Sequence, residues 1–166
     1  MKTACCSGEF LPEKSENIRR SVLDILLEKD VLILGCGSLS CLSGLYRGMV
    51  QRSMSHRFVP CYITDREYAL GRSEDVLLDC LRRTLKTCTA SGIILYASCT
   101  EVMIGCDFTG LLQHLGDTGS IIVRPFLRGP LLARRENIGA NARALVADLP
   151  PAKAEPYGPP CLPVPS

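Results

Sequence analysis

The chain has 166 residues, of which 46% are hydrophobic, and its 19 basic and 17 acidic side chains give a formal charge of +2. This length and hydrophobic content suit one globular domain with its own core, and so small a charge without a concentrated basic patch argues against a nucleic-acid partner. The apolar runs are far shorter than the ~20 residues that cross a bilayer, and no secretory leader is recognisable. We therefore expect a cytoplasmic protein without a membrane partner.

The first part of the chain predicts a lead, a helix, a strand and a second helix. Residues 1–14 lack periodicity and are expected to be a disordered lead. Ser15 is a candidate N-cap for a helix over 16–29, in which apolar residues recur at helical spacing and the end is basic. The continuous apolar run 31–34, ended by a glycine, is typical of a strand buried on both faces. A helix over about 40–52 follows.

The remainder alternates strands with helices. We expect strands over 58–63, 92–97 and 120–123, one helix capped by Ser73, and further helices over 107–115 and about 135–148. This alternation predicts an α/β fold: a three-layer, doubly wound, mostly parallel sheet in a single domain over residues 15–149. From residue 150 the repeated prolines predict a disordered tail over 150–166.

Cysteine is the unusual component of the sequence, with ten residues. In a cytoplasmic chain with a proper core such an excess indicates metal binding, redox chemistry or simple burial, and burial is the expectation for Cys80 and Cys88. Cys36 directly follows the first expected strand, Cys61 lies at the end of the second and Cys99 follows the third. Because ligands gather at the carboxyl ends of strands in such sheets, these thiols are candidate ligands of an iron-sulfur cluster.

Four segments strengthen this interpretation and together resemble a known family. They are, in chain order, Gly35-Cys36, His56-Arg-Phe-Val-Pro-Cys61, Asp65-Arg-Glu-Tyr-Ala-Leu-Gly71 and Tyr96-Ala-Ser-Cys99-Thr-Glu-Val-Met-Ile-Gly105-Cys-Asp107. The pattern resembles the N-terminal domain of nitrogenase component 1 type oxidoreductases, which include relatives of the nitrogenase molybdenum-iron protein and dark-operative protochlorophyllide reductase. The resemblance covers about residues 30–145.

The resemblance implies a cofactor and two partners. Cys36, Cys61 and Cys99 would be the metal ligands that one subunit contributes to a [4Fe-4S] or P-cluster-like centre, and a homologous subunit in a homo- or heterodimer would supply the rest. An ATP-dependent iron-sulfur reductase would deliver the electrons. Family subunits have three such domains and this chain has one, so we expect a subunit or truncated subunit, or else a non-catalytic cluster scaffold or maturation protein. No catalytic residue is predicted.

Several neighbouring residues admit two interpretations. His56 either tunes the cluster through a hydrogen bond to its surroundings or shapes a turn, and Cys41 and Cys106 either substitute for a ligand or pack locally. Asp107 is expected to cap a helix. Arg47, Arg52 and Arg57 either meet an acidic reductase surface or belong to a solvated helix face.

A dinucleotide-binding domain is a weaker alternative. The segment 35–40 imitates a G-x-G-x-x-G turn after the first strand, with Asp65 near the end of the next strand. Ser40 occupies the third glycine position, however, and the acidic residue comes later than this motif requires. Both departures weaken the nucleotide interpretation.

Overall fold

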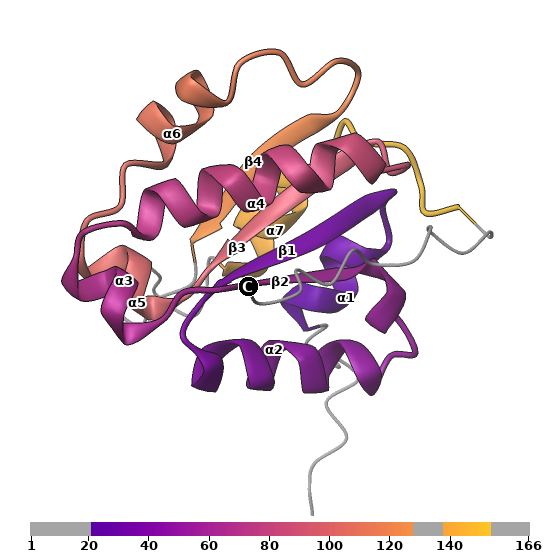
Figure 1. Ribbon diagram of the computed structural model, residues 1–166. Coiled ribbons are helices and arrows are strands. Elements are labelled where there is room, and N and C mark those ends of the chain that lie inside the picture. Colours follow the sequence, from indigo (N-terminus) through magenta and orange to yellow (C-terminus); the bar gives the residue numbers. More distant parts are fainter. Residues whose placement is uncertain (1–20, 128–137, 154–166) are drawn as a thin grey trace, which may run out of the picture.

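The computed structural model describes residues 21–127 and 138–153, and it contains one parallel four-stranded sheet with helices around it (Figure 1). The strand order is β2-β1-β3-β4, where β1 is Val31–Gly37, β2 is Phe58–Tyr62, β3 is Gly92–Ala97 and β4 is Ile122–Leu127. The other elements are α1 (Val22–Leu27), α2 (Leu39–Val50), the 3-10 turn η1 (Ser55–Arg57), α3 (Asp65–Ala69), α4 (Ser73–Thr87), α5 (Cys99–Met103), α6 (Phe108–Leu115) and α7 (Ile138–Val146). The predicted α/β class with a parallel sheet in a single domain is confirmed.

Two hydrophobic cores, one on each face of the sheet, make the fold three layers thick. Alternate residues of a strand face opposite sides, so Ile33 of β1 packs with α1, α2 and α7, whereas its neighbour Leu34 packs with α4 and α6. Figure 1 shows the two groups of helices on the two sides of the sheet. β1 and β3 are buried along their whole length, which explains why their sequences are continuously apolar rather than alternating.

Several predicted boundaries differ from the structure, and the differences at three elements follow. Ser21 has extended backbone angles and caps α1, so that helix begins at Val22, while the predicted cap Ser15 lies outside the described residues. β1 continues past the apolar run to Gly37, and β4 begins two residues later than predicted and reaches Leu127. None of the helices within the described ranges combines the length and the apolar character needed to cross a membrane.

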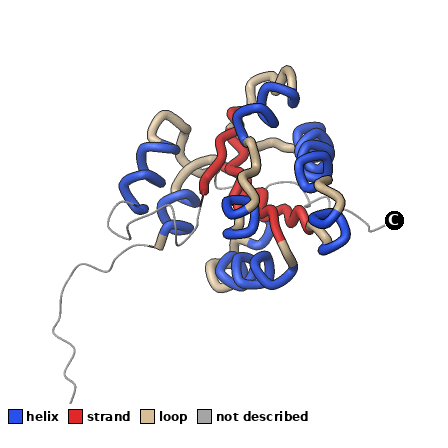
Figure 2. The backbone as a smooth tube through the Cα atoms, turned by 90° about the vertical axis from the view of Figure 1, so that its left-hand side faces the viewer, coloured by secondary structure: helices blue, strands red, loops and turns tan. Residues whose placement is uncertain are grey.

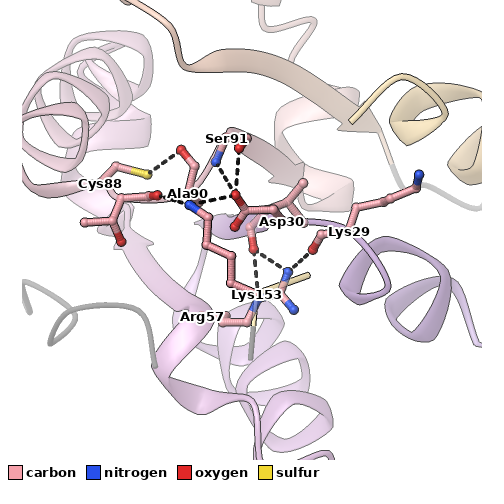
Figure 3. Close-up of polar contacts among 9 residues, drawn as sticks. Lys29, Asp30, Arg57, Cys88, Ala90, Ser91 and Lys153 are labelled. Carbon is pink, nitrogen blue, oxygen red and sulfur yellow. Dashed lines mark hydrogen bonds and ion pairs between the residues drawn. The ribbon is translucent and has the colours of Figure 1, made fainter. Parts of the chain in front are cut away.

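The amino ends of the strands are joined to the last described residues. The backbone N–H of Asp30 donates to the carbonyl of Pro150 at 2.9 Å, and Ala152 N–H donates to Glu28 O at 3.0 Å. Lys153 Nζ lies 3.0 Å from the buried Asp30 carboxylate (Figure 3). Residues 150–153 of the predicted tail are therefore attached to the domain, and both its remainder, 154–166, and the predicted lead, 1–14, lie outside the described residues.

Candidate functional site

The carboxyl edge of the sheet collects the features that the sequence singled out. α2, α3 and α5 begin there, two or three residues after the ends of β1, β2 and β3. This edge is at the left of Figure 1 and faces the viewer in Figure 2. As in other doubly wound sheets, the edge is where ligands would be expected to bind.

Cys36 and Cys61 lie side by side near this edge. They are register partners on β1 and β2, and both side chains enter the core beneath α4 and α6. The Cys36 thiol donates to the carbonyl of Tyr96 at 3.7 Å, and the Cys61 thiol lies 4.0 Å from the carbonyl of Val76 in α4. The residues are 0% and 2% exposed, so they sit just below the rim rather than on it.

The surroundings of these two thiols raise the pKa of each. Burial raises the pKa of Cys36, and the nearby charge of Glu101 adds to the effect. The pKa of Cys61 is raised first by a hydrogen bond to the thiol of Cys80 and then by burial. Since the thiolate is the form that binds a metal, neither residue is ready to act as a ligand in this conformation.

Cys99 lies at the rim itself, as the partly exposed first residue of α5. Cys36 is the register partner of Ala97 on β3, two residues before Cys99. Between them, Ser98 N–H donates to the Cys36 carbonyl at 3.2 Å. The three predicted ligands thus come from three neighbouring strand ends.

The positions of the three predicted ligands suit a shared cluster, but the burial of two of them does not. Ligands to a centre shared with a second subunit must reach the surface, and two of these thiols are fully covered. Within 21–127 and 138–153, no group of three or more His, Cys, Asp or Glu side chains is arranged to hold a metal ion. Binding a cluster here requires Cys36 and Cys61 to become exposed.

The sequence interpretation missed a buried acid at the same edge. Glu101 is 1% exposed. Its carboxylate accepts hydrogen bonds from the Ser98 N–H at 3.0 Å, from the Ser98 hydroxyl and from the Tyr68 hydroxyl of α3. Burial raises the pKa of Tyr68, and the Glu101 carboxylate raises it further. Ser98-x-x-Glu101 is a capping box, and this four-residue pattern was the available sequence signal.

Glycine is required opposite this acid. Gly37 has φ +147°, and a Cβ there would lie 2.6 Å from the Ser98 hydroxyl oxygen. The last residue of β1 therefore has to be small, because the Ser98–Glu101 pair fills the space beside it. The close approach is what brings the β1 and β3 ends together at the rim.

The other cysteines of this region are distributed between surface and core. Cys41 is exposed in the first turn of α2, and Cys80 is buried next to Cys61. Cys106 is partly buried, and burial followed by the charge of Glu74 raises its pKa to about 12. Cys88 lies at the opposite, amino edge, where its thiol contacts Ala90 O (Figure 3).

The remaining candidates take simple structural positions. His56 is in η1 at the amino end of β2, whereas Cys61 is towards its carboxyl end, so the turn-shaping interpretation suits His56 better. Asp107 caps α6 by accepting from the N–H groups of residues 109 and 110, as predicted. Arg52 pairs with Asp24, and Arg57 is buried, so neither is the free surface charge that both interpretations assumed.

The β1–α2 turn retains some features of a nucleotide site. The Ser38 side chain makes no capping hydrogen bond to α2 within the described part of the chain, so it does not occupy the first-turn amides. A Cβ on Gly35 would come within 2.8 Å of Leu45 and Phe58, so this glycine allows α2 to pack closely on the sheet. Leu39, 65% exposed, occupies the first helical position.

Comparison with known proteins assigns no family to the chain. No protein-family model matches it, and no curated protein sequence matches it either. The functional argument therefore depends on the motifs and on the geometry of the carboxyl edge.

Proposed function

We propose that this chain is a cytoplasmic iron-sulfur-binding subunit, or truncated subunit, of a nitrogenase-like oxidoreductase. The observation that carries the proposal is the register pairing of Cys36 with Cys61 beside the strand that leads to Cys99. A parallel sheet brings the carboxyl ends of its strands to one edge, so the three landmark cysteines belong to one region of the molecule. The resemblance of the surrounding motifs supplies the chemical identity.

The proposed partners are a homologous subunit and an ATP-dependent iron-sulfur reductase. A cluster when bound would accept electrons from the reductase. The contribution of this chain would be three thiolates, half of a shared ligand set. Because Cys61 lies beneath α4, its thiol can be released only when α4 shifts relative to β2, and a metal that replaces its proton would favour that shift.

The burial of two ligands favours a cluster carrier or maturation protein as the second candidate. A site that has to open in order to load a cluster can release it by the same opening. A permanent electron-transfer subunit gains more from ligands that are already in place. Transfer of the cluster to an acceptor apoprotein, as opposed to substrate reduction by an assembled complex, distinguishes the two.

Anaerobic reconstitution tests the proposal. The full chain is incubated with ferrous iron and sulfide, desalted and analysed for iron, sulfide and visible absorption. We expect bound iron in the parent and its loss in Cys36→Ala, Cys61→Ala and Cys99→Ala, each tested separately. Cys88→Ala is the matched control, because this partly buried cysteine lies at the amino edge and should leave the iron content unchanged.

Two results contradict the proposal. One is iron binding that survives all three substitutions, or that falls equally in Cys88→Ala. The other is saturable binding of NADH by the iron-free chain, which would indicate that the β1–α2 turn is a nucleotide site.

A further inference from the structure

Four cysteines gather in the core between the sheet and α4–α6, and two of them form a close pair. Cys36, Cys61 and Cys80 are buried in this core, with Cys106 packed against it. We propose that Cys61 and Cys80 are a peroxide-sensitive thiol pair that closes a disulfide between β2 and α4. The proposal needs no metal, and because the function proposed above assigns Cys61 to the cluster, the disulfide and the cluster exclude each other at this residue.

The position of the Cys61 sulfur carries this inference. It lies 4.0 Å from the carbonyl oxygen of Val76 in α4. In an α-helix the carbonyl of residue 76 accepts the backbone hydrogen bond of residue 80. The Cys61 sulfur is therefore beside the turn of α4 that carries Cys80, and the two residues are 2% and 5% exposed.

Both members of the pair are held on elements that pack on each other. Cys61 lies on β2 and Cys80 lies in α4, and the two side chains belong to the same buried cluster. Redox-sensing cysteines commonly have a resolving cysteine beside them.

Cys36 is the neighbouring thiol that should not compete. Its S–H points to the carbonyl of Tyr96 on β3, on the side of β1 away from β2. It is 0% exposed. Cys36 therefore does not aim its sulfur at Cys61.

The oxidant is hydrogen peroxide, whose small size and lack of charge suit a nearly covered thiol. One sulfur of the pair, as the thiolate, attacks one peroxide oxygen, the O–O bond breaks, and sulfenic acid and hydroxide form. The other sulfur then attacks the sulfenic sulfur, the S–O bond breaks, and the departing hydroxide takes the proton of the second thiol and leaves as water. In total two thiols and one peroxide give one disulfide and two waters.

Peptide mapping of the full chain tests the inference. The reduced protein, purified with a chelator to keep it free of metal, is treated with a few equivalents of hydrogen peroxide. Free thiols are then blocked with a maleimide, and the peptides are analysed by mass spectrometry. We expect the Cys61–Cys80 cross-linked peptide to be the main product within the core. It should be lost in Cys80→Ser and retained in the control variants Cys36→Ser and Cys88→Ser.

A second measurement traps the intermediate. In at least one of Cys61→Ser and Cys80→Ser, a dimedone probe should label the remaining member of the pair as a sulfenic acid that persists, because its partner thiol is gone; labelling of neither would overturn the proposal. Circular dichroism checks that each variant is folded, and the mapping of the unaltered chain stands even if a variant is not. A main cross-link between Cys36 and Cys61, oxidation confined to Cys41, or cross-linking only in denaturant would overturn the proposal.

Discussion

Arg57 shows how far the role of a single residue depends on tertiary structure. From the sequence it is one of three arginines near a proposed docking region, yet the fold leaves it 1% exposed. Its guanidinium donates to Val31 O at 2.7 and 2.9 Å, to Leu27 O at 2.8 Å and to Lys29 O (Figure 3). These carbonyls belong to the end of α1 and the start of β1, where the chain turns and helical partners run out.

Arg57→Met should therefore destabilise the domain. It leaves buried carbonyls without donors, which we expect to lower the free energy of unfolding by about 2–3 kcal/mol. Urea unfolding followed by circular dichroism measures the change. Arg47→Met, in the exposed middle of α2, is the control and should stay within about 0.5 kcal/mol of the parent. Equal stability of the two variants would show that solvent replaces the Arg57 donors.

At the scale of elements, the continuously apolar strand was the easiest to predict. β3 matches its predicted span, 92–97, because all its residues are buried and no polar residue interrupts the pattern. β4 was misplaced because its first residue is exposed and because Arg124 and Pro125 resemble a break. The arginine pairs with Asp148 after α7, and the proline is accommodated because β4 is an edge strand. The ion pair and the edge position are both features of the tertiary structure, so the local sequence does not reveal them.

The short helices at the carboxyl edge are marked in the sequence by their capping residues. α3 and α5 have five residues each, too few for an apolar periodicity, but Thr64-x-x-Glu67 and Ser98-x-x-Glu101 are capping boxes. The placement of Cys36, Cys61 and Cys99 on neighbouring strand ends could be anticipated from topology alone. The burial of two of them could not, because it depends on how α4 and α6 lie over the sheet.

Both edge strands place a proline where a free donor would otherwise point outward. Ile122 N–H of β4 donates inward to Ser91 O, so by alternation the nitrogen of residue 125 faces the open edge. Pro125 thus removes a donor from the unpaired side, as Pro60 does on β2, where Ile63 N–H donates inward to Gly37 O. Such prolines discourage one sheet from adding to another.

Pro125→Thr should promote self-association without unfolding the domain. Threonine restores the outward N–H and favours a strand, so concentration-dependent oligomers should appear in light scattering while the unfolding free energy changes by about 1 kcal/mol or less. Val123→Thr adds no donor to the same strand and is the control. Monomeric behaviour of Pro125→Thr at every concentration that keeps the parent monomeric would mean that this edge is protected by something other than the proline.

At the scale of the whole molecule, one buried carboxylate joins the two ends of the described chain. Asp30, at the start of β1 and 0% exposed, accepts from Ser91 N–H at 3.0 Å and from the Ser91 hydroxyl at 2.6 Å. Lys153, three residues after Pro150, places its ammonium 3.0 Å from the same carboxylate and also donates to Thr89 O (Figure 3). A single group thereby links the α1–β1 turn, the start of β3 and the segment after α7.

Because the buried Asp30 carboxylate needs the Lys153 ammonium to offset its charge, the effects of substituting these two residues on the unfolding free energy should not be additive. Lys153→Met removes the charge that offsets a buried anion and should lower the unfolding free energy by about 1–3 kcal/mol. In the Asp30→Asn background, where the anion is gone, the same substitution should cost much less, so a double-mutant cycle in urea should give a coupling of at least about 0.5 kcal/mol. Lys86→Met, at an exposed position in α4, controls for loss of a surface charge. If the effects of Lys153→Met and Asp30→Asn simply add, the segment after α7 is held by its backbone hydrogen bonds to residues 28 and 30 and not by this ion pair.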